Sequence, residues 1–324
     1  MSRSEKWLAR QSVVVAAVGA LLLAGCSTGN ETDTEASGDD TASSEKCSVG
    51  MTQINQTAVF FTQMNEGAQE AAKAAGCELQ IANANNDSAK QNSDIENFVS
   101  QGVSAIIVVA IDVNGVLPAV KAAREQGIKV VAIDAKLEDG AVETFVGVDN
   151  AKAGAEAATW VIDQGLADGS SYGVVDAKNS FIQNQREDSF RKAVDAAGAT
   201  HTQSVNGDNV QEKAATAAQN LVTAEPDLDF VYTTGEPATV GAVAALKGNK
   251  DTVIIGWDLT KEVIAGIDSG LVRAVVQQDP KQEGIEAVNE LKSILDGGEP
   301  KGFVDVPITI VTKENVDEYR PIFP

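Results

Sequence analysis

Short apolar runs alternate with helical patterns between residues 49 and 277, and the alternation falls into two successive series. Apolar runs of this length between helices are typical of strands buried in a parallel sheet. The predicted strands are Val49–Ile54, Leu79–Ala82, Ala105–Val109 and Val130–Ile133, then Tyr172–Val175, Phe230–Thr233, Val253–Gly256 and Ala274–Gln277. Strands that alternate with helices form right-handed βαβ units. The sequence therefore predicts an α/β fold of two doubly wound parallel-sheet lobes.

The stretch Lys129–Asn150 lies where the first series passes into the second. Its apolar run ends at Asp134, a second strand-like run follows at Thr144–Val148, and the helical pattern of Ala151–Gly165 comes next. Ligands of open α/β sheets bind outside the carboxyl ends of the strands. Asp134 therefore stands at a predicted binding edge.

Capping residues mark two predicted helices of the first series. The helix Met64–Ala75 ends at Gly76, a residue that readily takes the left-handed conformation of a helix stop. Either Asp87 or Ser88 is the predicted N-cap of a helix that runs to about Gln101. Both helices fall between predicted strands, as βαβ units require.

Residues 1–26 have the three parts of an export signal: a positively charged start, the apolar core Ser12–Ala24, and small residues before Cys26. The core is shorter than the roughly 20 residues that a membrane-spanning helix needs. The order Leu-Ala-Gly-Cys resembles the bacterial lipobox, which implies cleavage after Gly25 and a lipid on Cys26; an ordinary secretory signal is the alternative. Residues 27–46 are rich in Ser, Thr, Gly, Asp and Glu, and we expect a flexible tether between the lipid and the folded part.

The formal net charge is −22, from 47 acidic and 25 basic residues. Nucleic acids and anionic lipid surfaces both require basic residues, so this balance argues against either as a partner. The single histidine, His201, lies in a predicted surface connection at 199–205, which argues against histidine-based metal sites and catalysis. No glycine-rich phosphate loop and no nucleophile-elbow motif is present, so we expect no cofactor and no catalytic residues.

Two of the three cysteines, Cys47 and Cys77, stand just before the first and second predicted strands. These two strands are usually neighbours in a doubly wound sheet, so their first residues would lie about 5 Å apart. That separation suits a disulfide, and an exported protein occupies a compartment where the bond persists. We predict a Cys47–Cys77 disulfide; the alternative is two unpaired thiols.

Polar or aromatic residues follow the carboxyl end of nearly every predicted strand. They are Asn55 with Phe60 and Phe61, Asp134, the stretch from Asp176 to Arg186, Thr234 to Glu236, Asp258 and Gln278. In two such lobes these ends converge on the crevice between them, where a small polar ligand can be enclosed.

Six motifs at these positions carry a resemblance to a known family. They occupy residues 60–76, 127–134, 146–158, 185–193, 253–258 and 274–280, in the family's order. The chain resembles the type I periplasmic solute-binding proteins, in the ribose-binding-like sugar branch that serves ABC importers. The resemblance covers about residues 48–313, nearly all of the predicted folded part.

The resemblance implies a set of ligand contacts. Phe60 and Phe61 match the aromatics that sandwich a sugar ring. Asp134 and Asp258 match carboxylates that accept hydrogen bonds from sugar hydroxyls, and Arg186 matches the arginine that donates to them. Two further polar matches are Gln278, and Asn55 in the first loop, at or near the family's binding asparagine.

Three departures from the family pattern change the implied ligand. Ala135 and Lys136 stand where ribose binders often have arginine after the first aspartate, and Asn209 stands where they place an aromatic residue. Gly235 and Glu236 occupy the region of a binding asparagine. Since an unpaired buried polar group is costly, we expect a polyol, another aldose or a smaller sugar derivative rather than D-ribose.

Each contact has a structural alternative. Phe60 and Phe61 fit the buried start of a helix, and Asp134 and Asp258 fit helix caps. Arg186 fits a surface partner of a neighbouring acidic residue, which would contribute little to stability.

The family pattern implies an architecture and a function. One lobe would comprise residues 47–148 and 279–305, and the other 149–278 and 306–324, joined by a three-strand hinge. The protein would be an extracytoplasmic, lipid-anchored monomer without catalytic activity that closes on a sugar or polyol and docks on an ABC permease. Three other classes compete: a sugar-responsive transcription regulator, a sugar hydrolase that uses Asp134 and Asp258, and a sensory receptor for a sugar derivative.

Overall fold

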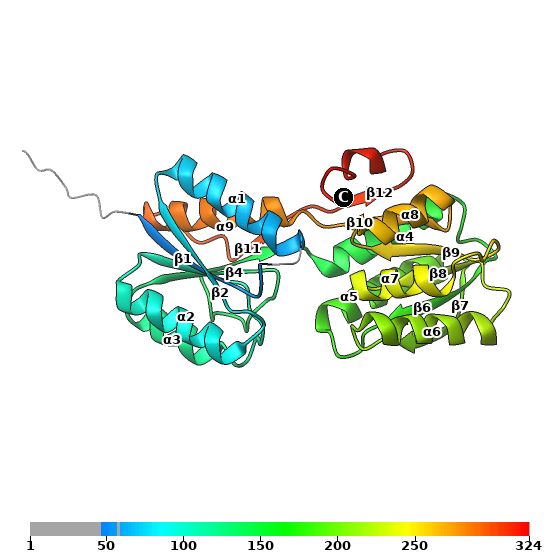
Figure 1. Ribbon diagram of the computed structural model, residues 1–324, viewed down its shortest axis with the longest axis horizontal. Helices are drawn as coiled ribbons and strands as arrows, with labels where there is room; N and C mark the ends of the chain where they lie inside the picture. The colour runs from blue at the N-terminus through cyan, green and yellow to red at the C-terminus, as the bar shows by residue number, and fades with distance from the viewer. Residues whose placement is uncertain (1–46, 57–58, 324) are drawn as a thin grey trace, which may run out of the picture. The chain divides into compact units, whose positions relative to one another are not determined.

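The computed structural model describes residues 47–56 and 59–323. These residues form two lobes, each built on a six-stranded sheet with helices on both faces (Figure 1). The strand orders are β2-β1-β3-β4-β5-β11 in the first lobe and β7-β6-β8-β9-β10-β12 in the second, so the two sheets repeat one strand order. The predicted pair of doubly wound α/β lobes is confirmed.

The first sheet is parallel throughout. Its strands are β1 Ser48–Gln53, β2 Glu78–Asn83, β3 Ala105–Val108, β4 Lys129–Ile133, β5 Thr144–Gly147 and β11 Phe303–Asp305. Its helices are α1 Val59–Ala75, α2 Ser88–Gln101, α3 Leu117–Glu125 and α9 Pro280–Leu295. One apolar core lies under α1 and α9, and a second lies under α2 and α3.

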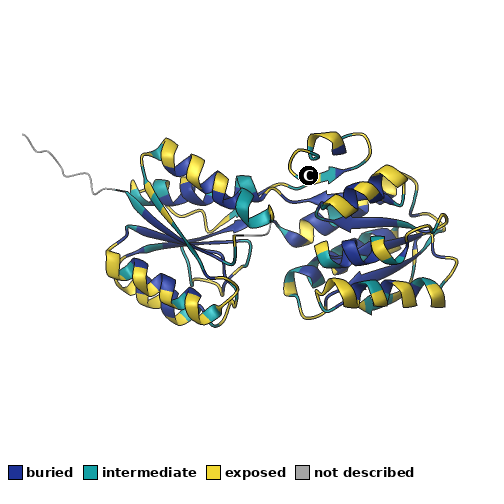
Figure 2. Ribbon diagram, viewed as in Figure 1, coloured by how far each residue is buried: buried dark blue, intermediate teal, exposed yellow. Residues whose placement is uncertain are grey.

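The second sheet is parallel except for β12, which runs antiparallel to β10. Its strands are β6 Ser171–Asp176, β7 Thr200–Asn206, β8 Phe230–Thr233, β9 Val253–Trp257, β10 Val272–Gln277 and β12 Thr309–Val311. Its helices are α4 Asn150–Asp163, α5 Phe181–Ala196, α6 Gln211–Ala224, α7 Glu236–Ala245, α8 Lys261–Ser269 and the short 3₁₀ helix η1 Val316–Glu318. One core lies under α4 and α5, the other under α6, α7 and α8. Figure 2 shows the central strands of both sheets buried and the outer helix faces exposed.

The chain passes between the two sheets three times: from β5 to α4, from β10 to α9, and from β11 to β12. The predicted three-segment connection is therefore confirmed. The residue numbers at which we divide the lobes, including a signal segment at 1–26 and a tether at 27–46, stay predictions. Residues 1–46 lie outside the described residues.

The predicted helix boundaries hold at three of four positions. Asp87 caps α2 by accepting hydrogen bonds from two backbone N–H groups, and Gly76 has the left-handed φ of 68° that ends α1. The predicted start of α1 at Met64 is wrong, since the helix already includes Val59. Phe60 and Phe61 therefore sit in the first turn of a helix.

Helices α1 and α9 touch through glycines. A Cβ atom at Gly67 would lie 2.0 Å from the carbonyl oxygen of Lys281, and one at Gly284 would lie 2.2 Å from that of Met64. The two backbones can approach so closely only because both residues lack a side chain. This contact places the first turn of α9 beside α1.

The predicted Cys47–Cys77 disulfide is present, with Cα atoms 4.7 Å apart at the starts of the neighbouring strands β1 and β2. The predicted position of His201 in a surface connection is wrong. His201 belongs to β7, where its ring lies 5.3 Å from that of Tyr172. Within the described part of the chain, no helix is both long and apolar enough to cross a membrane.

Candidate ligand-binding site

Asp134 and Asp258 occupy equivalent places in the two lobes. Each follows the fourth strand of its sheet and has a left-handed backbone, with φ of 62° and 59°. Each N–H donates to a carbonyl of the next strand, Asp134 to Val146 and Asp258 to Val276, at 3.0 Å. Neither residue is the N-cap of a helix, so the helix-cap alternative is wrong for both. Aspartate tolerates this conformation better than most residues, which lets the chain turn while keeping a carboxylate at the strand end.

Arg186 of α5 is buried, with 3 % of its surface exposed, so the alternative of a surface ion pair is wrong. Its Nε donates to Asn150 Oδ1 at 2.7 Å, and its Nη1 donates to the carbonyl oxygen of Thr234 at 3.1 Å. Its guanidinium carbon lies 3.7 Å from the ring centroid of Trp257. Hydrogen bonds on two sides and an aromatic face below hold the planar group in one orientation.

Gln278 connects Arg186 to Asp258. Its Oε1 accepts from Arg186 Nη2 at 3.3 Å, while its Nε2 donates to both carboxylate oxygens of Asp258 at 3.0 and 3.1 Å. Gln278 is 7 % exposed and immediately precedes the passage from β10 to α9. The second lobe therefore presents a preformed polar array that ends on a carboxylate.

Burial and the neighbouring charges shift the pKa of both Asp134 and Asp258. Burial raises the pKa of Asp134 to about 6, with the positive charge of Arg186 opposing the shift and the negative charge of Asp258 adding to it. Burial also raises the pKa of Asp258, against the effects of Arg186 and Gln278. Arg186 thus acts on carboxylates of both lobes, which places all three groups within electrostatic reach of one another.

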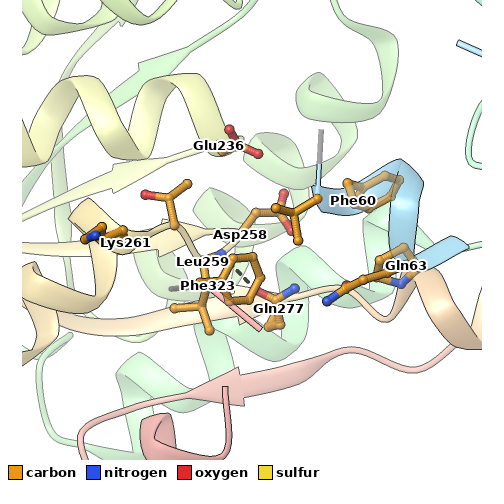
Figure 3. Close-up of a pocket in the computed structure, with 11 residues that line it drawn as sticks. Phe60, Gln63, Glu236, Asp258, Leu259, Lys261, Gln277 and Phe323 are labelled. Atoms are coloured by element: carbon orange, nitrogen blue, oxygen red, sulfur yellow. Dashed lines mark hydrogen bonds between the residues drawn. The ribbon is translucent and has the colours of Figure 1, made fainter. Parts of the chain in front are cut away.

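A pocket of about 330 Å³ adjoins this array (Figure 3). Its lining comes from α1, α7, α8 and α9, from the connection between β9 and α8, from the end of β10, and from the segment after η1. The residues are Val59, Phe60, Gln63, Glu236, Asp258, Leu259, Thr260, Lys261, Gln277, Pro280 and Phe323. Figure 3 shows Phe60 and Gln63 on one side, and Glu236 and Lys261 on the other. A cavity of this size suits a small molecule.

The two phenylalanines differ in their surroundings. Phe60 lines the pocket, whereas Phe61 does not, and both pack in part against the core of the first lobe. Their rings meet edge to face, with centroids 5.4 Å apart and an interplanar angle of 89°. The buried-helix-start alternative therefore holds in part for both residues.

Asn209 belongs to a second polar cluster near Arg186. Gln183 of α5 donates from Nε2 to Asn209 Oδ1 at 2.8 Å, and its Oε1 accepts from the Thr234 hydroxyl at 2.7 Å. A Cβ atom at Gly235 would lie 2.9 Å from the amide of Gln183, so the glycine makes room for that side chain. Asn209 itself is exposed and lies outside the pocket lining.

Two predicted contacts lie away from the pocket. Lys136 is exposed and forms an ion pair with Asp139 at 2.9 Å. Asn55 donates to Asn86 Oδ1 at 3.2 Å and is absent from the pocket lining. The binding role assigned to these two residues stays a prediction, as does that of every other predicted ligand contact.

Sequence reasoning missed several residues of the site. Asn150 and Gln183 orient the array, and Glu283 of α9 is a fully buried acid that interacts electrostatically with Asp134 and Asp258. Asn150 lies in the family motif at 146–158, beside a predicted helix start, and that position was the available signal. Glu283 gave no such signal, because an acidic residue one turn into a helix usually faces solvent.

Two α/β lobes of equal topology, with polar residues at the carboxyl ends of their strands, define a two-lobed binding-protein architecture. Residues 49–299 match the periplasmic binding protein domain family, and the chain belongs to this family, in its ribose-binding-like sugar branch. The chain is 28 % identical to the ribose import binding protein of Bacillus subtilis, over 93 % of this chain and 98 % of that one.

Solved structures show the same relationship. An ABC transporter solute-binding protein from Mycobacterium smegmatis, with bound glycerol, is 30 % identical with a TM-score of 0.72, over 84 % of this chain and 96 % of that one. A sugar-binding protein of a sugar ABC transporter from Bacillus halodurans has a TM-score of 0.79 at 22 % identity, over 85 % of this chain and all of that one. The second likeness concerns the fold alone.

Proposed function

We propose that this protein is the extracytoplasmic substrate-binding component of an ABC importer and that it captures a small sugar or polyol between its lobes. The observation that carries the proposal is the hydrogen-bonded array Asn150–Arg186–Gln278–Asp258, which ends at a pocket lined by both lobes. The names of two relatives support it: one is a ribose import binding protein, and the other is an ABC transporter solute-binding protein.

The array suits hydroxyl-rich ligands. Sugar hydroxyls both donate and accept hydrogen bonds, so adjacent hydroxyls can pair with a carboxylate and a guanidinium at once. Asp134 and Asp258 would accept from such hydroxyls and Arg186 would donate to them, while Phe60 offers an apolar face to ring C–H groups. Phe61, Asn55, Lys136 and Asn209 would join only on lobe closure, and binding should then consist of capture without chemical change.

The N-terminal segment supports a location outside the cytoplasm. A lipid on Cys26 would anchor the chain at the outer face of the membrane, and residues 27–46 would let it reach a permease. We propose that the ligand-closed monomer docks on that permease, because a transporter can select the closed form only through a difference in affinity. Incorporation of a labelled fatty acid into the wild-type chain, but not into Cys26→Ser, tests the anchor.

Calorimetric titration of the purified full chain with pentoses, hexoses and polyols tests the binding function. We expect one ligand class to bind, and Asp258→Asn to weaken that binding by roughly tenfold or more, because a charged acceptor is lost. Asparagine also tolerates the left-handed backbone at this position, so the variant should fold. Asp251→Asn, an exposed change just before β9 at the strand's other end, is the matched control.

Two results would contradict the proposal. One is a folded protein that binds none of the sugars or polyols in the titrations. The other is binding that Asp258→Asn and Asp251→Asn change equally, since the ligand would then sit elsewhere.

A further inference from the structure

Carboxyl groups outnumber cationic groups around the pocket. Glu236 and Asp258 line it, and Lys261 is the single cation among the described residues of the lining (Figure 3). Desolvation raises the pKa of Glu236, and the negative charges of Asp258 and Glu262 raise it further. The charges that act most on Glu236 therefore have its own sign.

Arg186 does not neutralise this excess. All three of its nitrogens already donate to uncharged acceptors, on Asn150, Thr234 and Gln278. Among the ion pairs of the described residues, none joins Arg186 to a carboxylate. Its charge reaches Asp134 and Asp258 only through space, and it leaves the pocket acids without a bonded cation.

Glu283 is a further carboxyl near Asp134 and Asp258, and its surroundings disfavour the charged form. Its side chain is fully buried, and neither carboxyl oxygen has a hydrogen-bond partner among the described residues. Burial raises its pKa well above the usual value, and the charges of Asp134 and Asp258 raise it further. A buried polar group without a partner is uncommon and costly, so Glu283 adds to the cost of the acids around the ligand-free site.

The acids are not arranged for a metal ion. Within the described part of the chain, no group of three or more His, Cys, Asp or Glu side chains could hold one. An organic ammonium makes smaller demands, because two or three acceptors at hydrogen-bond distance satisfy its N–H groups. It also brings the positive charge that a hydroxyl lacks.

We infer that the ligand is a sugar or polyol carrying a protonated amino group, whose ammonium donates to Glu236 and Asp258. This inference rests on the proposed function and specifies its substrate class. The hydroxyls of the same ligand would remain for Asp134 and Arg186. Charge-assisted hydrogen bonds are about twice as strong as neutral ones, so the amino compound should bind better than its hydroxyl parent.

Matched pairs of ligands test the inference with the full chain at neutral pH. Calorimetry would compare 2-amino-2-deoxyhexoses with their parent hexoses and an amino-inositol with inositol, and putrescine would serve as an amine without hydroxyls. We expect at least one amino compound to bind about tenfold or more tightly than its parent. In Glu236→Gln that preference for the amino compound should fall by about tenfold.

Glu299→Gln is the control, because it removes one exposed carboxylate from the loop between α9 and β11 and should leave the preference unchanged. Circular dichroism would verify that each variant is folded. Parents that bind as tightly as their amino counterparts would overturn the inference and leave the proposed function standing. Putrescine binding as tightly as the best amino sugar, or a preference that survives in Glu236→Gln, would overturn it as well. An absence of binding by every compound would overturn both.

Discussion

The acidic site should make the ligand-free protein less stable than it would be without those acids, and Asp134→Asn isolates one contribution. Burial raises the pKa of Asp134 from 3.8 to about 6. Between these values the folded state holds a proton that the unfolded state has lost, so stability falls as the pH rises through this window. A shift of about two units at 1.36 kcal/mol each corresponds to about 3 kcal/mol of lost stability above pH 6.

Asparagine has nearly the shape of aspartate, carries no charge and tolerates the left-handed backbone of this position. We therefore expect Asp134→Asn to raise the free energy of unfolding by about 3 kcal/mol at pH 8, and by less than about 1 kcal/mol at pH 4. Urea titrations of the ligand-free protein at both pH values measure the difference. Ligand affinity should fall at the same time, because the variant loses a charged acceptor.

Asp251→Asn, at an exposed position, is again the control and should change stability by less than about 0.5 kcal/mol at either pH. The reasoning fails if Asp134→Asn has the same effect at pH 4 and pH 8, because the gain would then not come from charge. It also fails if the variant is less stable than the wild type at pH 8.

Three further predictions follow, two on the scaffold, measured by urea unfolding, and one on the binding site, measured by calorimetry. Cys47→Ser should lower the free energy of unfolding by about 2–4 kcal/mol, and reductant should lower that of the wild type equally; no change would mean that the bond adds nothing. Gly67→Ala should cost about 1–3 kcal/mol or more, because the new Cβ meets the Lys281 carbonyl, and an unchanged stability would refute the close contact. Asn150→Ala should weaken ligand binding about tenfold, because Arg186 loses the acceptor that orients its Nε, and unchanged affinity would exclude this positioning role.

The sheets could be predicted because their buried strands are short runs of apolar residues in the sequence. Every predicted strand is present, and Asp134 and Asp258 were found because they follow such runs directly. Strand β7 escaped recognition because it is an edge strand, with the mostly exposed sequence Thr200–Asn206 and no apolar run. The start of α1 was placed too late, because Phe60 and Phe61 were interpreted as ligand contacts that precede the helix.

The orientation of the site could not be predicted from the sequence. Arg186 lies in a helix with several charged residues, and nothing local distinguishes it from Arg191, which remains partly exposed. Its burial follows from tertiary contacts: Gly154 lets α4 approach α5, since a Cβ there would lie 2.4 Å from the carbonyl oxygen of Arg186. Contacts between elements far apart in the chain do not change the local periodicity of apolar residues, so they cannot be predicted from it.

The binding site contains buried charged residues of a kind that the apolar cores of the two lobes lack. The cores of both lobes are apolar and closely packed, whereas Glu283 is buried without a partner and Arg186 without a bonded counter-charge. Such departures reduce the stability of the ligand-free state, and they persist where a function requires them. A ligand that brings positive charge to Glu236 and Asp258 would reduce the repulsion among the acids of the site. Its binding free energy would then include relief of strain already present in the protein, which favours the closed, liganded form that a transporter must recognise.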